Sequence, residues 1–231
     1  MSSAESLKYL HILLFVAWLG IDVGVFSSSF VVRNRGLSGE TRMVLRRLMR
    51  GLDLAPRLSL VLMIPIVVTL AHATNTGALG LPDALLWAIG AGGLLWAALL
   101  VWNFAQADAL GTITRPDRRQ LVRAIARVDT GLRMCAAAGF LTTGVWSIVS
   151  DGPWQVWTVA WKSTIFGLVV LAGLWIRFAG KAFGPALRTV VADGETEDQL
   201  RRMDIAMRRV YPAVVGIWVA LLVMAGIAVF G

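Results

Sequence analysis

The chain has 231 residues, of which 57% are hydrophobic and 16% are charged. This composition is typical of a polytopic membrane protein and excludes an ordinary soluble domain. The formal net charge is +8, and the chain contains two histidines and a single cysteine, Cys135. A disulfide framework and a cysteine-based metal site are therefore excluded.

Six apolar runs follow one another along the chain, each near the length of about 20 residues that a bilayer core requires. They predict an all-α fold, a polytopic membrane protein with six transmembrane helices in three hairpins. Residues 1–231 are expected to form one helical-bundle domain. The predicted spans cover 9–32, 54–74, 83–106, 130–150, 156–179 and 210–230.

Basic residues gather at the loops after the first, third and fifth spans, which together with Arg57 and Arg177 at the adjoining span ends hold 19 of the 22 Lys and Arg residues. The connections HATNTGALGLPD and SDGPW hold none. Basic loops stay in the cytoplasm, so both termini are predicted to lie outside. The segments SGETRMVLRRLMRGL and RPDRRQLVRAIARV are amphipathic and are predicted to continue as short helices that touch anionic headgroups. The lipid bilayer of a bacterial inner membrane is thus the expected partner, and nucleic acid is not.

The first span carries two ionisable residues inside an apolar stretch. At about 100° per residue, His11, Trp18 and Asp22 fall on one stripe of the helix. A charge at the centre of a span costs roughly 2.5–3.5 kcal/mol on insertion scales, so the stripe is predicted to face protein and to form a site or an internal pair. The alternative is a histidine near the headgroups and an aspartate satisfied by a neighbouring helix. The stretch is also longer than a signal-peptide core, so a retained first helix is expected.

The second span runs from inside to outside, which places His72 near the same outer face as His11. Two imidazoles from neighbouring helices can hold a haem iron in a bundle, and they could equally bind copper or zinc. His11 is the first candidate ligand. His72 is the second, although it lies at a helix end, where a solvated histidine is common. Met63, Met134 and Met224 lie in spans and could replace one ligand, but most such residues fill core.

Lys162 lies early in the fifth span, directly after Trp161. Its ammonium can snorkel outward or reach a buried anion such as a haem propionate or an aspartate. The tryptophans near predicted boundaries, among them Trp87, Trp154 and Trp157, are expected to form aromatic belts. No hydrolase triad or nucleotide-binding loop can be assembled from the spans.

Two kinds of short pattern predict packing rather than chemistry. Gly20 and Gly24 form a G-x-x-x-G step, and AIGAGGLL in the third span is similarly small, so close helix contact is expected there. An Asp-x-x-x-Arg step recurs at the cytoplasmic entry of spans two, four and six. Each step is expected to pair acid and base over one helical turn. The three steps are Asp53–Arg57, Asp129–Arg133 and Asp204–Arg208.

Several local patterns resemble one superfamily of small polytopic membrane proteins. The first span reads LHILLFVAWLG, with His11 followed by Trp18 at the seventh position. The next loop reads RRLMRGLDLAP and ends in Pro56, WKSTIFGLVVL contains Lys162, and RVYPAVV contains Pro212. These segments are similar to those of the HemJ-type protoporphyrinogen oxidases and the CopD-type copper-resistance proteins. The resemblance covers most of the chain.

The resemblance implies an integral membrane protein that binds haem b and acts in electron transfer or as a membrane oxidoreductase. It implies a haem b or metal site that uses His11, with Lys162 as a helper. At such a site we expect His11 as an axial ligand, Trp18 beside the cofactor and Lys162 on a propionate, while Asp22 tunes the site or relays protons. The alternatives are a CopD-like copper transport protein and a cofactor-free subunit or assembly factor of a larger membrane complex. A redox partner, such a complex or a second copy of the chain remain open as partners.

Overall fold

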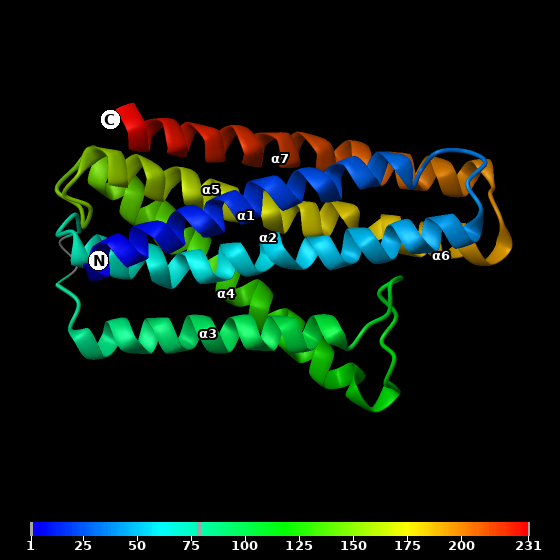
Figure 1. Ribbon diagram of the computed structural model, residues 1–231, viewed down its shortest axis with the longest axis horizontal. Coiled ribbons are helices and arrows are strands. Elements are labelled where there is room, and N and C mark those ends of the chain that lie inside the picture. The colour runs from blue at the N-terminus through cyan, green and yellow to red at the C-terminus, as the bar shows by residue number, and fades with distance from the viewer. Residues whose placement is uncertain (1, 78–79, 231) are drawn as a thin grey trace.

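The computed structural model describes residues 2–77 and 80–230, which fold into long helices joined by short loops (Figure 1). Within these residues, six helices are long and apolar enough to cross a membrane. The predicted all-α polytopic fold is therefore confirmed. The α-helices are α1 (Ser3–Val31), α2 (Gly39–Ala73), α3 (Asp83–Ala105), α4 (Arg119–Val149), α5 (Trp157–Ala179), α6 (Phe183–Asp193) and α7 (Glu197–Phe230), and the 3₁₀ turns are η1 (Pro116–Arg118) and η2 (Gly180–Ala182).

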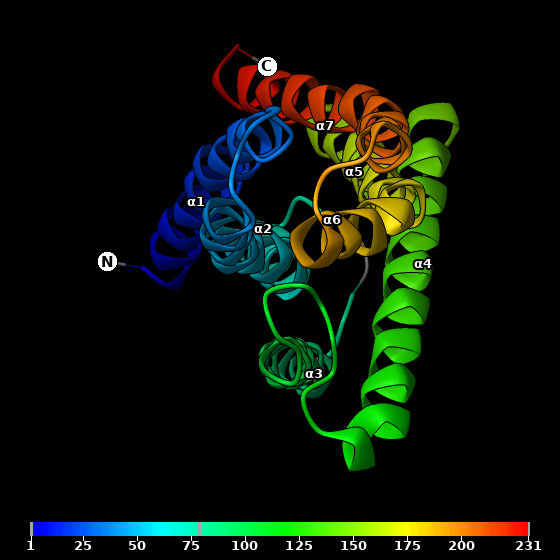
Figure 2. The ribbon, with the colours of Figure 1, turned by 90° about the vertical axis from the view of Figure 1, so that its right-hand side faces the viewer.

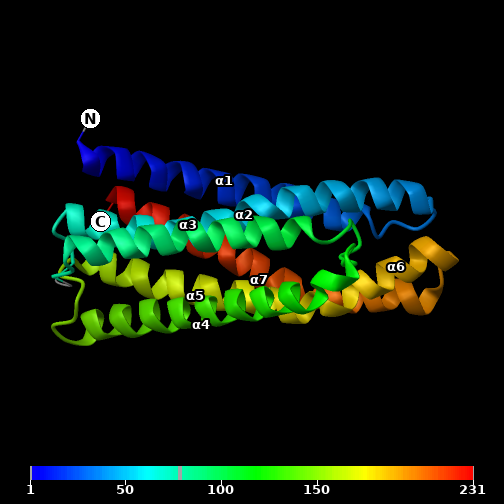
Figure 3. The same cartoon turned by 90° about the horizontal axis from the view of Figure 1, so that it is seen from below.

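Successive long helices run in opposite directions, so the two termini lie at one end of the bundle and α6 lies at the other (Figures 1 and 3). The loops rich in arginine are at the end that carries α6. The positive-inside rule predicts that this end faces the cytoplasm, and it is called the inner end below. Figure 2 shows that α3 stands apart from α5 and α7, on the far side of α2.

Three helices begin well before their predicted spans at the inner end, namely α2, α4 and α7. The amphipathic segments continue the second and fourth spans without a break, as the first turns of α2 and α4. Ser38 starts α2, since its side chain accepts a hydrogen bond from the backbone N–H of Thr41. On α2 the extension packs on protein: Met49 is buried in one apolar cluster with Phe183 of α6 and Met203 of α7. This cluster fixes the inner end of the bundle.

The closest helix packing is between α4 and α5, and two glycines permit it. A Cβ added at Gly144 would lie 2.6 Å from the backbone nitrogen of Thr164, and one added at Gly167 would lie 2.6 Å from Cγ of Leu141. The third span also makes a close contact, at Gly93. The prediction for the first span was wrong at Gly20, where an added Cβ would meet nothing within 4 Å. A motif in one helix does not say whether a partner faces it.

We expect Gly144→Ala to destabilise the protein by about 1–3 kcal/mol, because the added methyl group meets backbone that cannot move aside. Gly139→Ala, on the same helix, is the matched control, since nothing lies within 4 Å of its added Cβ. Alanine is also the better helix former, so the control should be neutral or slightly stabilising. Thermal unfolding of the detergent-purified variants measures the difference, and equal melting temperatures would contradict this account of the α4–α5 contact.

The outer end is tied together by Trp154. This side chain is buried, and its indole N–H donates to Oγ1 of Thr143 at 3.1 Å. Its backbone pairs with Gly77 in an isolated β-bridge that joins the two outer loops. The prediction of an interfacial belt was therefore wrong for Trp154. Trp87 and Trp157 are exposed, as a belt requires.

Candidate functional site

The predicted stripe on α1 begins with a half-buried histidine at the outer part of the bundle. Nδ1 of His11 is buried and has no hydrogen-bond partner among the described residues. Two helical turns further along α1, Trp18 is 4% exposed. Its ring meets the ring of Phe166 of α5 edge-on, with centroids 6.4 Å apart. The ammonium of Lys162, also on α5, lies within electrostatic range of His11. Three predicted site residues thus come from two neighbouring helices to one region.

The register of α1 against α2 places the two histidines at different depths. Gly24 of α1 faces Leu52 of α2 at 3.5 Å. In this antiparallel pair His11 therefore lies opposite residue 65, seven residues before His72. At 1.5 Å per residue, the two histidines are roughly 10 Å apart along the helix axis. Nε2 of His72 lies 4.0 Å from the carboxylate of Asp83 at the start of α3, and its side chain is half-exposed. The structure does not bring the two histidines into one site.

Of the three methionines considered, Met63 is closest in depth to His11. The same register places it opposite residue 13, within one helical turn of His11. Met63 is buried in the apolar cluster that contains Trp18 and Phe166. Met224 packs at the edge of that cluster, whereas Met134 is exposed.

Asp22 lies in a different place from the outer part of the stripe. It is eleven residues from His11, or roughly 16 Å along α1. Its carboxylate accepts a hydrogen bond of 2.8 Å from the indole N–H of Trp218 on α7, and Asp53 of α2 lies within electrostatic range. The aspartate is thus satisfied by a neighbouring helix, as the alternative from the sequence expected, and the stripe splits into an outer and an inner part.

A buried charge cluster that the sequence did not predict surrounds Asp129 on α4. The carboxylate accepts hydrogen bonds from Trp96 of α3 at 2.9 Å, from Arg133 one turn along α4 at 3.0 Å, and from Arg177 of α5 at 2.7 Å. Arg177 also donates to the hydroxyl of Thr130. One carboxylate therefore joins three helices and is shared by two arginines. The Asp-x-x-x-Arg step was the only signal for it in the sequence.

Two of the three predicted Asp-x-x-x-Arg steps form ion pairs within their helix. Asp53 binds Arg57, and Asp129 binds Arg133 as described above. The third step differs, because Asp204 binds Arg33 at the end of α1 instead. In the third hairpin the acid therefore ties α7 to α1.

Metal-binding capacity is limited in the described part of the chain. Within 2–77 and 80–230, no group of three or more His, Cys, Asp or Glu residues lies close enough to hold a metal ion. A haem iron needs only one or two axial ligands from the protein, which His11 and a thioether can supply.

The fold and these residues define a helical membrane protein of six spans, with the buried Nδ1 of a half-buried histidine toward one end and a buried charge cluster toward the other. Comparison with protein-family models, with curated proteins and with solved structures gave no match. What the chain does is therefore inferred from its own residues.

Proposed function

We propose that this chain is an integral membrane protein of the bacterial inner membrane that holds haem b through His11. In this proposal it acts in electron transfer or in a membrane oxidoreductase reaction. The observation that supports it is the buried Nδ1 of His11, which has no hydrogen-bond partner among the described residues. Buried polar atoms in proteins are nearly always satisfied, so this unpartnered ring nitrogen inside a span supports a bound group at the site.

The second axial position is proposed for Met63 rather than His72. Met63 is buried at nearly the depth of His11, while His72 lies about two turns away beside Asp83. A histidine and a methionine together are a known haem ligand pair and favour a raised reduction potential. Bound haem would supply one-electron chemistry, and the chain would hold, orient and shield it.

The other predicted site residues take separate parts in this proposal. Lys162 would bind a propionate, because it lies one turn before Phe166 on α5, on the outer side of the contact between Phe166 and Trp18. Trp18 would form an apolar wall of the site together with Phe166. Asp22 lies three turns further in, so its proposed part is proton transfer on the inner side and not contact with haem.

The test compares two histidine variants by absorption spectroscopy, oxidised and dithionite-reduced. We expect the purified protein to show a Soret band, and His11→Ala to lose it through loss of the axial bond. His72→Ala is the matched control and should keep its haem. Size-exclusion profiles check that both variants fold.

Three results would contradict the proposal. Full haem content in His11→Ala would exclude His11 as the ligand. A colourless wild-type protein with bound copper would favour the copper-transport alternative instead. A wild-type protein with neither haem nor metal would favour a subunit or assembly factor, and co-purifying proteins would identify its complex.

A further inference from the structure

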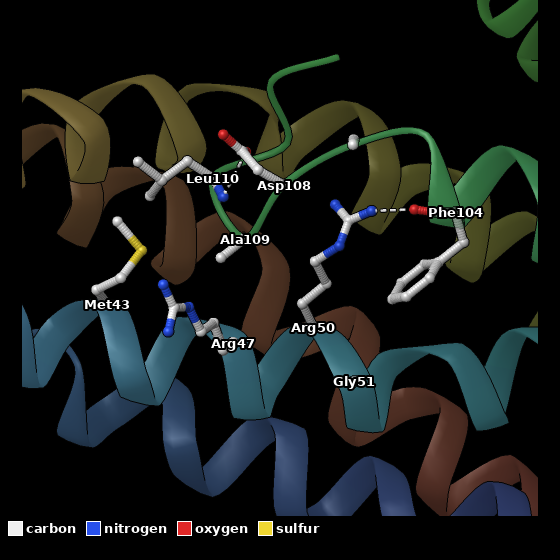
Figure 4. A pocket seen from close by; sticks show the side chains of 9 residues that line it. Met43, Arg47, Arg50, Gly51, Phe104, Asp108, Ala109 and Leu110 are labelled. Carbon is white, nitrogen blue, oxygen red and sulfur yellow. Dashed lines mark hydrogen bonds between the residues drawn. The ribbon is translucent and has the colours of Figure 1, made fainter. Parts of the chain in front are cut away.

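A cavity of about 500 Å³ opens between α2 and the loop that follows α3, at the inner end of the bundle (Figure 4). Its walls include Arg47 and Arg50 of α2, and Phe104 and Leu110 on the opposite side. A second cavity of about 280 Å³ shares Arg50 and Phe104 with the first and continues between α3 and α4. The two form one groove that runs from the inner surface into the span region.

The two arginines at the mouth of this groove outnumber its one acidic residue, Asp108. Arg47 and Arg50 are three residues apart on one face of α2, and both extend toward the loop (Figure 4). Among the described residues neither forms an ion pair. Arg50 donates to the carbonyl oxygen of Phe104 and lies 4.2 Å from the centre of its ring, and both of these groups are neutral.

The acidic residues of the groove are already engaged. Oδ1 of Asp108 accepts hydrogen bonds from the backbone N–H groups of Leu110 and Thr112, at 2.9 and 2.8 Å, and so shapes its own loop. Deeper in the groove, Arg177 is bound to Asp129. The residues that line the mouth thus carry the two positive charges of Arg47 and Arg50 against the one carboxylate of Asp108, which leaves a net positive charge for an anion to offset.

The groove also has apolar walls that reach the bilayer. Val128 and Leu132 of α4 line its deeper part, and they are 55% and 41% exposed. Leu132 lies within the predicted span 130–150 and Val128 just before it, so both side chains face the boundary between headgroups and hydrocarbon. A ligand that combines an anionic head with apolar chains matches this succession of charge and apolar surface.

We infer that the groove binds an anionic phospholipid of the inner leaflet, with its phosphate between Arg47 and Arg50 and an acyl chain along Val128 and Leu132. Arginine is suited to phosphate oxygens, because its guanidinium presents several donors in a fixed plane. Basic pockets between transmembrane helices on the cytoplasmic side are known sites for anionic headgroups. The inference does not depend on haem or on His11.

Native mass spectrometry with added phosphatidylglycerol tests the site. We expect Arg47→Gln/Arg50→Gln to weaken lipid binding by about 30-fold, at about 1 kcal/mol per arginine. Arg123→Gln/Arg127→Gln is the matched control, because it removes two exposed charges from the inner part of α4. The control should retain its bound lipid. Arg47→Gln alone leaves the contacts of Arg50 intact and serves if the double variant does not fold; it should weaken binding by about fivefold.

A second arm separates a lipid from a free anion. Phosphatidylglycerol should raise the melting temperature of the wild type and of the control, and inorganic phosphate or phosphatidylcholine should not. Equal stabilisation by inorganic phosphate would overturn the assignment to a lipid. Equal lipid loss in the double variant and in its control would show that only the total surface charge matters and would overturn the site.

Discussion

Asp129→Ala is expected to destabilise the protein by about 3–5 kcal/mol, because it leaves two arginines in the protein interior without a counter-ion. Arg133 and Arg177 both bind this carboxylate, and their side chains are 11% and 32% exposed. The substitution also removes the acceptor of the Trp96 indole, which is the hydrogen bond that ties α3 to α4. For a chain of this length, the melting temperature should fall on the order of 10 °C.

The control for Asp129 is an aspartate in another Asp-x-x-x-Arg step, whose side chain is exposed to water. Asp198 binds Arg202 one turn along α7 at 2.8 Å, and both side chains are about two-thirds exposed. Asp198→Ala should therefore cost less than about 1 kcal/mol. Thermal unfolding in detergent compares the two variants, and a similar fall in both would argue against a special role for burial at Asp129.

The second large effect is expected at Arg42, near the start of α2. Its side chain is fully buried, and its guanidinium donates to the backbone carbonyls of Val32, Asn34 and Leu37 at 2.6, 2.9 and 3.2 Å. It also forms an ion pair with Glu195 in the loop between α6 and α7. This one residue thus closes the α1–α2 loop and fastens it to a distant loop.

Arg42→Ala should lower the free energy of unfolding by about 3–5 kcal/mol. It leaves the carboxylate of Glu195 without its cation and three backbone carbonyls without their donor. The matched control is Arg35→Ala, which breaks the pair between Arg35 of the same loop and Glu197 at the start of α7. Those side chains are 71% and 78% exposed, so the control should cost less than about 1 kcal/mol. Limited proteolysis from the inner side should cut the α1–α2 loop faster in Arg42→Ala only. Equal cleavage in both variants would contradict the proposal that Arg42 holds the α1–α2 loop closed.

The six spans could be predicted from the sequence, because each is an apolar run long enough to cross a bilayer. The positions of the basic residues in the sequence then predicted which loops lie at the same end of the bundle. Helix starts were less accessible: α2 begins at Gly39, well before its apolar run, because its amphipathic first turns are buried by α6. The covering helix, Phe183–Asp193, is short and was not predicted, since it is neither long nor apolar enough to resemble a span.

The sites were only partly accessible, since periodicity shows which residues share a face of a helix and not what faces them. His11 and Trp18 were correctly expected to point toward protein. The depth of His72 depends on the register of α1 and α2, which is set by their loop and by the contact of Gly24 with Leu52. The partners of Asp129 are distant in sequence, so no local pattern links it to Trp96 or Arg177.

The outer loops have a consequence for how the protein enters the membrane. The segments that connect α2 to α3 and α4 to α5 contain no lysine or arginine, so each of these helix pairs can be translocated as a unit without carrying a fixed positive charge through hydrocarbon. The bridge between Gly77 and Trp154 joins one loop from each pair. Because it needs one residue from each loop, it forms only when both helix pairs have been inserted to the same depth.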